Sequence, residues 1–216
     1  MKGSARAVLL FVALLVSISL AAAASLPKSR LEAVPTSLIQ TKVSGAHASM
    51  PKYRLLDDCY PKSNPKKLLG GKIDAAWITN TCAIRISACF NCAAEKGHPG
   101  LKIPKLANNE SITCAKGNNH IYRVKTFVPQ YLNKNFGAPS IVAVPPKGQK
   151  RGVSMTPFEG KAGVIRWDTT GAWATATGHI SLLRPNGETI EEAMTPEKIA
   201  EYFSVAIKVE LWEADV

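Results

Sequence analysis

The sequence predicts an α+β domain, in which helices come first along the chain and an antiparallel sheet follows. Three observations support this: a buried helical pattern that starts at Cys82, an amphipathic helical pattern over residues 122–136, and β patterns from Gly163 onward. Helices segregated from strands along the chain are typical of α+β domains rather than of alternating α/β ones. The domain is expected to span residues 50–216.

Two segments are expected to precede this domain. Residues 1–24 combine Lys2 and Arg6, an apolar run over residues 7–20 and four alanines, which are the parts of a secretory signal peptide. A retained signal anchor is disfavoured, because the apolar run is shorter than the roughly 20 residues that typically span a bilayer. Residues 25–49 are polar and contain two prolines, as in a disordered N-terminal extension or a propeptide. We therefore expect a secreted, extracellular protein without a membrane partner after cleavage.

The first part of the domain is predicted to consist of loops around one buried helix. Prolines and lysines gather over residues 61–67, and a Gly-Gly turn follows before the cysteine. From Cys82 to about Ala94, apolar and small residues recur at helical spacing. The Gly-His-Pro-Gly sequence at residues 97–100 ends this helix.

A second helix is predicted over residues 122–136. Its apolar residues follow the i, i+3, i+4 spacing of an amphipathic helix: Val124, Phe127, Val128, Tyr131 and Leu132. Gly137 stops the pattern, and Pro129 either lies near the beginning of the helix or interrupts it.

The rest of the domain is predicted to be mostly sheet. Strands are expected over residues 163–167, 179–183 and 204–213, with a return strand from Glu188. An Arg-Pro-Asn-Gly turn signal at residues 184–187 joins the second strand to its return strand. Thr195 as a cap and Pro196 at the first helical position predict a helix before the last strand.

The charge of the chain favours an anionic partner. The sequence has 27 Lys and Arg against 16 Asp and Glu. Removing residues 1–24, which hold two basic residues and no acidic one, leaves 25 − 16 = +9. A positive surface attracts nucleic acid, acidic lipid or the polyanionic bacterial envelope. The lysines are scattered and lack the interleaved aromatic residues of a base-stacking platform, so a nucleic-acid partner is not expected.

Five cysteines in a chain expected to be secreted leave one without a partner: Cys59, Cys82, Cys89, Cys92 and Cys114. If Cys82 is the free thiol, the other four can form two disulfides, with three connectivities open. The alternative is that the odd cysteine is only a small buried apolar residue. Cys89 and Cys92 have the spacing of half a metal site, but no second pair or histidine cluster completes it, so neither a metal nor another cofactor is expected.

Cys82 is the candidate nucleophile, and His179 is its candidate base. Cys82 lies in an Asn-Thr-Cys-Ala-Ile sequence, a turn that runs into the predicted helix. A helix N-terminus presents unpaired N–H groups and a partial positive charge, which stabilise a thiolate over a thiol. A histidine from another segment completes the activation of such a cysteine. The sequence therefore predicts a cysteine–histidine enzyme.

A third residue should orient the imidazole of His179. A two-residue turn centred on Pro185 and Asn186 places Glu192 directly opposite His179, and directly opposed side chains share a face. Moving the turn by one residue keeps Glu192 on that face, whereas Glu191 points away unless a bulge intervenes. Glu192 is the predicted orienting residue, and Glu191 is the alternative. A further interpretation is that both are solvated charges on an edge strand.

Other polar and aromatic residues near these two receive structural interpretations. Arg85 is expected to bind internal carbonyls rather than a substrate carboxylate, and Asn80 is expected to cap the helix. The N–H groups of the turn before the helix, including that of Cys82, are the expected donors to an oxyanion. Tryptophans are expected to pack in the core, with a sugar-peptide groove as the alternative for three of them: Trp77, Trp167 and Trp173.

Four blocks of sequence carry a resemblance to a known family, and they cover roughly residues 68–192. The blocks are Gly70-Gly71-Lys72-Ile73; Asn80-Thr81-Cys82-Ala83-Ile84-Arg85-Ile86-Ser87; Ile121-Tyr122-Arg123-Val124 with Tyr131-Leu132 and Phe136-Gly137; and Gly160-Lys161-Ala162-Gly163-Val164-Ile165 with Ala176-Thr177-Gly178-His179-Ile180-Ser181-Leu182. In order and spacing they resemble the type VI secretion amidase effectors, family four.

This resemblance implies a papain-like, NlpC-type cysteine amidase, with its nucleophile at the N-terminus of a core helix packed on an antiparallel sheet. It implies Cys82 as nucleophile, His179 as general base, and bacterial peptidoglycan stem peptides as the substrate, cut between D-glutamate and meso-diaminopimelate. The third residue of the family is an aspartate. This chain has no aspartate between Asp168 and Asp215, and the position falls at Glu192.

The resemblance also implies an antibacterial role and an inhibitor or immunity-type protein as a partner. The predicted leader differs from the export route of the family, so we expect a secreted form, either acquired by a eukaryotic host or belonging to a bacterium. The alternative function is a non-catalytic wall-binding protein that retains the fold. The sequence does not predict an oligomeric state.

Overall fold

The computed structural model describes residues 38–39, 47–107, 109–173, 176–191 and 194–216. The segment predicted to be a signal peptide, most of the predicted extension, and Glu192 lie outside the described residues. Within the described part of the chain, no helix is both long enough and apolar enough to cross a membrane.

The helices occupy most of the first half of the described chain and return once near its end. They are α1 (Tyr53–Cys59), α2 (Pro65–Leu69), α3 (Cys82–Glu95), α4 (Val124–Phe127), α5 (Asn133–Phe136) and α6 (Pro196–Val205), with 3₁₀ turns η1 (Gly71–Asp74), η2 (Pro99–Leu101) and η4 (Thr156–Phe158) and a π-helical turn η3 (Val128–Leu132). The predicted helix that begins at Cys82 is therefore confirmed. So is the helix predicted at Pro196, where the Thr195 hydroxyl accepts a hydrogen bond from the backbone N–H of Lys198 at 3.3 Å.

Five antiparallel strands form the main sheet, in the order β1-β4-β7-β5-β6. Their bounds are β1 (Leu38–Ile39), β4 (Ile141–Ala143), β5 (Gly163–Asp168), β6 (Gly178–Leu183) and β7 (Lys208–Glu213), and a separate hairpin pairs β2 (Ser111–Thr113) with β3 (Asn119–Ile121). The predicted α+β fold is confirmed. The short strand β1 lies within the segment that was expected to precede the domain.

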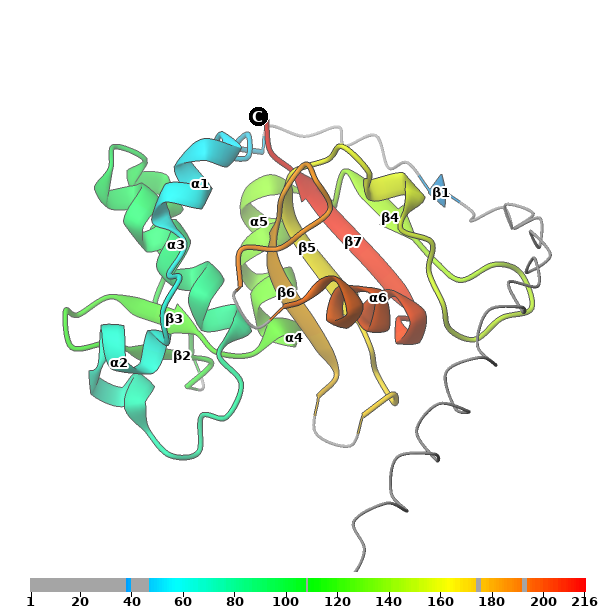
Figure 1. Ribbon diagram of the computed structural model, residues 1–216. Helices are drawn as coiled ribbons and strands as arrows, with labels where there is room; N and C mark the ends of the chain where they lie inside the picture. Colours follow the sequence, from blue (N-terminus) through cyan, green and yellow to red (C-terminus); the bar gives the residue numbers. More distant parts are fainter. Residues whose placement is uncertain (1–37, 40–46, 108, 174–175, 192–193) are drawn as a thin grey trace, which may run out of the picture. The chain divides into compact units, whose positions relative to one another are not determined.

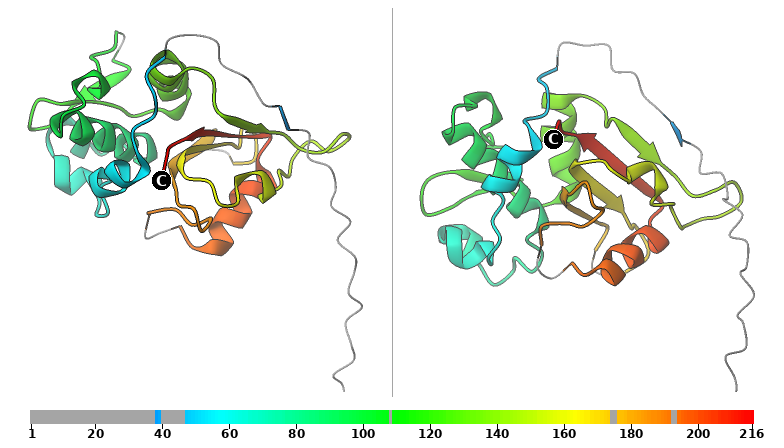
Figure 2. Two further views of the ribbon diagram at one scale, coloured as in Figure 1. Left: turned by 90° about the horizontal axis from the view of Figure 1, so that it is seen from above. Right: turned by 45° about the horizontal axis from the view of Figure 1, so that its top comes forward.

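Alternation along the strands gives the sheet two apolar faces. On β5, Val164 belongs to a core that includes residues of α3 and α4, whereas Trp167 belongs to a second core on the other face. Ile199 and Phe203 of α6 cover this second core. Figures 1 and 2 show α6 on one face of the sheet and the α4–α5 segment on the other.

The predicted helix over residues 122–136 is present from Val124 to Phe136, but a π-helical turn interrupts it. Pro129 lies in that turn. Because proline has no N–H, it cannot continue the regular hydrogen-bond ladder, and the wider π turn absorbs the break. Pro129 therefore interrupts the helix, one of the two outcomes expected from the sequence.

The turn after β6 differs from the predicted two-residue turn. The N–H of Arg184 donates to the carbonyl of Glu188 at 2.8 Å, and Leu183 pairs with Thr189. Three residues therefore lie between Arg184 and Glu188, so paired residue numbers sum to 372 rather than 371. The predicted return strand is reduced to this single bridge among the described residues. A shift of one residue in register exchanges the two faces of a strand, so Glu191 comes to the face that carries His179.

Candidate active site

Cys82 is the first residue of α3, and it lines a hollow. The residue is only 5% exposed. Its backbone N–H donates to Oδ1 of Asn80 at 3.1 Å, which satisfies one of the free N–H groups at the helix start. The N-cap position belongs to Thr81, whose side chain makes no capping bond, so the predicted cap at Asn80 is wrong; the Asn80 side chain instead shapes the turn before the helix. The Cys82 N–H, expected to be an oxyanion donor, is engaged by this side chain in the structure.

His179 lies on β6, where its ring is held by aromatic neighbours. It stacks on Tyr202 of α6 with ring centroids 4.7 Å apart, and Trp167 lies 5.7 Å away. Nε2 of His179 is 3.2 Å from Oε2 of Glu191. Burial by itself disfavours a charged ring, but the contacts with Cys82 and Glu191 outweigh it and raise the pKa of His179 to about 9.

Glu191 is held from three directions. Its Oε2 faces His179, and its Oε1 accepts a hydrogen bond from the Tyr60 hydroxyl at 2.8 Å. Nε of Arg85 lies 3.6 Å from the same Oε1. Burial works in the opposite sense, but the contacts with His179, Tyr60 and Arg85 lower the pKa of Glu191 below its usual value. The side chain is thus a buried carboxylate that points at the imidazole.

The acidic residue that contacts the imidazole is Glu191, the alternative of the sequence analysis. Glu192, which was preferred there, lies outside the described residues. The preference for Glu192 depended on a two-residue turn, and the three-residue turn that is present reverses the parity of the following residues.

Arg85 is bound to the protein itself. Its Nη1 donates to the carbonyl oxygens of Pro61 at 2.6 Å and Ser63 at 2.8 Å. Together with the contact to Glu191, these bonds tie the segment after α1 to the side chain that orients His179. The expectation that Arg85 binds internal carbonyls is confirmed.

The cysteines form one disulfide rather than the two that the sequence allowed. Cys59 at the end of α1 is bonded to Cys92 on α3, whereas Cys82, Cys89 and Cys114 are free and buried. The thiol of Cys89 donates to the carbonyl of Leu56 at 3.2 Å within the main core. Cys114 belongs to a separate apolar cluster. Because these two thiols lie in different clusters, the expected second disulfide does not form.

Two hollows meet at Cys82. The larger has a volume of about 620 Å³ and is lined by Lys62, Ser63, Asn64, Thr79, Asn80, Thr81, Cys82, Arg85, Ala176, His179, Glu191, Met194, Lys198 and Tyr202. The smaller has a volume of about 240 Å³ and shares Asn80, Cys82 and Ala176 with the larger one. A chain bound at the cysteine can therefore extend into either hollow.

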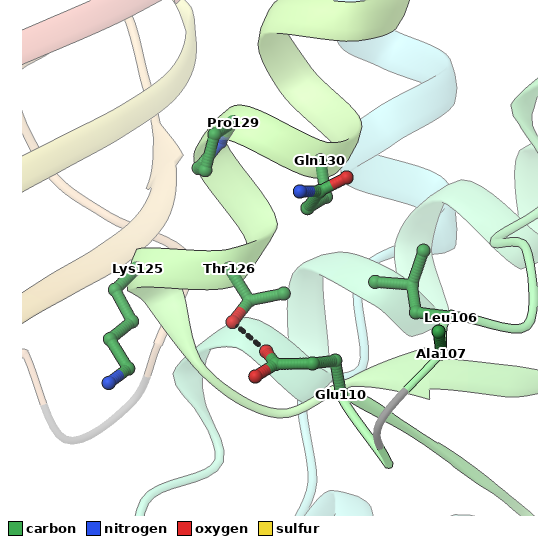
Figure 3. A pocket seen from close by; sticks show the side chains of 7 residues that line it. All are labelled: Leu106, Ala107, Glu110, Lys125, Thr126, Pro129 and Gln130. Carbon is green, nitrogen blue, oxygen red and sulfur yellow. Dashed lines mark hydrogen bonds between the residues drawn. The ribbon is translucent and has the colours of Figure 1, made fainter.

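A third hollow, of about 400 Å³, is lined by none of the Cys82, His179 and Glu191 side chains (Figure 3). Glu110 and Thr126 line it and are hydrogen-bonded to each other, as the dashed line in Figure 3 shows. Its described lining residues include neither a cysteine nor a histidine, so cysteine–histidine chemistry belongs to the two hollows at Cys82.

A family model described as "Type VI secretion system (T6SS), amidase effector protein 4" (Tae4) matches residues 78–212, more than half of the chain. The chain belongs to this family. The matched residues include Cys82, His179 and Glu191. No curated protein matches the chain.

Solved structures of Tae4 proteins share the fold. The effector of the Tae4–Tai4 effector–immunity complex from Enterobacter cloacae is 23% identical, with a TM-score of 0.60 over 77% of this chain and 99% of that one. The corresponding structure from Salmonella typhimurium is 20% identical, with a TM-score of 0.59 over 77% and 99%. Tae4 from Enterobacter cloacae alone is 23% identical, with a TM-score of 0.60 over 78% and 99%.

Tyr60 and Tyr202 are site residues that sequence reasoning missed; Tyr202 stacks on His179 and lines the larger hollow. Tyr60 lies outside the segment that the Tae4 family model matches, yet its hydroxyl binds Glu191. No local pattern around Tyr60 indicates this role, because the contact joins residues 131 positions apart in the sequence. The adjacent cysteine was the only available signal, since the Cys59–Cys92 disulfide fixes the end of α1 against α3.

Proposed function

We propose that this chain is a secreted cysteine amidase that hydrolyses the peptide stem of bacterial peptidoglycan at the bond between D-glutamate and meso-diaminopimelate, and that it acts against bacteria. The observation that carries the proposal is the alignment of Cys82, His179 and Glu191 at a hollow that opens around the cysteine. Membership of an amidase effector family supports the reaction class. Secretion rests on the composition of residues 1–24.

The mechanism is acyl transfer through a thioester. His179 accepts the thiol proton, and the Cys82 thiolate attacks the carbonyl carbon of the scissile amide. Because Nε2 of His179 faces Glu191, Nδ1 is the nitrogen that accepts the proton from the Cys82 sulfur. The imidazolium then gives its proton to the departing amine, and His179 activates the water that hydrolyses the thioester. Glu191 stabilises the positive imidazolium through these steps and keeps the ring oriented.

The developing oxyanion needs a donor close to Cys82. In the structure the Cys82 N–H is occupied by Asn80. When the substrate binds, the Asn80 side chain must turn aside to free this N–H, or its own amide N–H must serve as the donor. Asn80 lines both hollows at the cysteine, which is compatible with either contribution.

The test is Cys82→Ala in purified protein incubated with peptidoglycan. Release of new amines should fall to the uncatalysed level, because no nucleophile remains to form the thioester. Cys114→Ala is the matched control, since it removes a buried free thiol of a different cluster. Mass spectrometry of the fragments identifies the bond that is cut. Amine release that persists in the folded Cys82→Ala variant contradicts the proposal.

The second candidate is a wall-binding protein without catalysis. Such a protein has no need of a free thiol, and the sequestration of Cys82 in a disulfide would favour it. Cys82 is free of disulfides and contacts His179, which favours the enzyme. Because solved relatives are effector–immunity complexes, we include an immunity-type inhibitor among the partners of this chain.

A further inference from the structure

The smaller hollow at Cys82 has the chemistry of an anion site. Besides the residues it shares with the larger hollow, it is lined by Tyr122, Arg123, Val124, Lys125, Thr177 and Gly178. Two of these are cations, and no carboxylate occurs among the described lining residues. The hollow of Figure 3, which Lys125 also lines, differs because it contains the carboxylate of Glu110. A carboxylate ligand therefore suits the hollow at the cysteine and not the one beyond it.

Arg123 is the arginine of this region that remains able to bind a ligand. The guanidinium of Arg85 is occupied by two carbonyls and by Glu191. The side chain of Arg123, by contrast, makes no hydrogen bond or ion pair with another described residue; only its backbone carbonyl accepts hydrogen bonds, from the N–H groups of Thr126 and Phe127. Its guanidinium lies over the ring of Tyr122, 5.1 Å from the centroid. A planar guanidinium with free N–H groups matches the two oxygens of a carboxylate.

The Tyr122 ring on which Arg123 stacks is held in turn by a second aromatic residue, Trp77. The ring of Trp77 meets that of Tyr122 edge-on, with centroids 5.3 Å apart. Trp77 is 60% exposed, so it borders the solvent instead of packing in the core as expected, whereas Trp167 is fully buried. An aromatic support limits the orientations of the guanidinium in the free protein. This reduces the entropy lost when a ligand binds.

Because the smaller hollow borders Cys82, the groups that can enter it are those next to the scissile bond of the substrate. Cys82 lines both hollows, so a peptide whose scissile carbonyl lies at the sulfur must extend its flanking groups into them. A stem peptide that contains D-glutamate and meso-diaminopimelate carries free carboxylates on both sides of the proposed scissile bond. Either flank can therefore supply an anion to the smaller hollow.

We propose that Arg123, assisted by Lys125, binds a free carboxylate of the stem peptide next to the scissile bond and so determines specificity for acidic over amidated stems. This inference rests on the proposed function for the identity of the substrate. The candidate sources are the α-carboxylate of D-glutamate and a carboxylate of diaminopimelate. They share one chemistry and are separated by the experiment below.

The test measures binding to the Cys82→Ala protein, which binds the peptide without cutting it. The probes are a synthetic stem tetrapeptide with all carboxylates free, an analogue amidated at D-glutamate, and an analogue amidated at diaminopimelate. Arg123→Gln in the Cys82→Ala background should raise the Kd of the free peptide about tenfold or more, because a charge-assisted bidentate contact is lost. The Kd of the analogue that lacks the recognised carboxylate should be the same with and without Arg123→Gln, which identifies the source.

Arg54→Gln is the matched control. Arg54 is exposed on α1 and lines neither hollow, so it changes the net charge by the same amount without touching the site. Three results would overturn the inference. Arg123→Gln could weaken the binding of all three probes equally, Arg54→Gln could weaken binding as much as Arg123→Gln does, or the free peptide could show no measurable binding. Binding that depends on Arg123 in a protein without amidase activity leaves the subsite in place and refutes the proposed function. If the wild type cleaves the peptide but its binding does not depend on Arg123, the proposed function stands and the Arg123 subsite is refuted.

Discussion

Glu191 is the third residue of the proposed catalytic group, after Cys82 and His179, and it orients the imidazole of His179. A glutamate side chain is longer than the aspartate that the family resemblance implies as the third residue, a position that the resemblance placed at Glu192. The longer Glu191 side chain is nevertheless held in one orientation, because the Tyr60 hydroxyl donates a hydrogen bond to Oε1 at 2.8 Å while Oε2 faces His179. Arg85 adds a positive charge 3.6 Å from Oε1. The three contacts hold an ionised carboxylate in one orientation despite its burial.

Replacing Glu191 with glutamine should lower kcat by about 10²-fold or more, since a neutral amide cannot stabilise the imidazolium of His179. Rates of amine release under substrate saturation measure this effect. Glu192→Gln is the matched control, because it makes the same chemical change at the neighbouring residue and should leave kcat nearly unchanged. A large loss in Glu192→Gln with full activity in Glu191→Gln would instead assign the orienting role to Glu192.

The raised pKa of His179 predicts how the free energy of unfolding changes with pH. Its folded value of about 9 exceeds the ordinary value of 6.5. The contribution of His179 to stability is therefore fully present below about pH 6.5 and is lost as the pH rises through about 9. Between these limits, the difference in unfolding free energy between the wild type and His179→Gln should shrink with increasing pH. Denaturant titrations at several pH values measure it, and a difference that grows over this window contradicts the assignment.

At the scale of elements, the Cys59–Cys92 disulfide links α1 to α3 just outside the site. The residue after Cys59 is Tyr60, which binds Glu191, and the following segment supplies the carbonyls that hold Arg85. The same segment contributes Lys62 to the larger hollow. The disulfide is thus placed to stabilise the fold and to keep the orienting residue in position.

Removing this disulfide by the double substitution Cys59→Ser and Cys92→Ser should reduce both stability and activity. A cross-link between residues 33 positions apart is expected to contribute about 3–4 kcal/mol in the chain-entropy account. Denaturant unfolding measures that loss, and kcat below the unfolding transition tests the positioning of Glu191. Cys114→Ser is the control for serine at a buried cysteine position. Full kcat in the folded double variant would mean that Tyr60 is held without the disulfide.

At the scale of the whole molecule, the site is assembled from three separate parts of the chain, the last of which supplies both His179 and Glu191. Tyr60 follows α1, Cys82 begins α3, His179 lies on β6, and Glu191 follows the turn after β6. The antiparallel sheet and the packing of α3 against β6 bring them together. The full chain carries a net charge of +11, and the proposed secreted form without residues 1–24 carries 25 − 16 = +9. This charge favours accumulation at an anionic wall.

Hydrolysis of insoluble peptidoglycan should therefore be more sensitive to salt than hydrolysis of a soluble stem peptide. Exposed charges are screened beyond about 10 Å at 0.1 M salt and beyond about 3 Å at 1 M. Raising NaCl from about 0.05 M to about 0.5 M should lower the rate on intact walls several-fold, with a smaller change on the soluble peptide. Parallel rate measurements on the two substrates test this. Equal salt dependence would exclude adsorption by net charge.

The sequence by itself determined the features that depend on local periodicity. The helix that begins at Cys82, the strand that carries His179, and the capped helix at Pro196 follow from spacing, capping residues and strand patterns within short windows. The blocks around Cys82 and His179, together with two other blocks within residues 68–192, carried the resemblance to the Tae4 family. The fold class and the two central site residues could therefore be predicted from sequence.

The tertiary structure alone decided which groups surround these residues. It selected Glu191 as the residue that contacts His179, paired Cys59 with Cys92, and brought Tyr60 to the site. The physical reason is that the contact of Tyr60 and the disulfide join residues 131 and 33 positions apart in the chain, so no local pattern encodes them. For Glu191, one additional turn residue was enough to exchange the face on which this residue lies, because side chains alternate with a period of two.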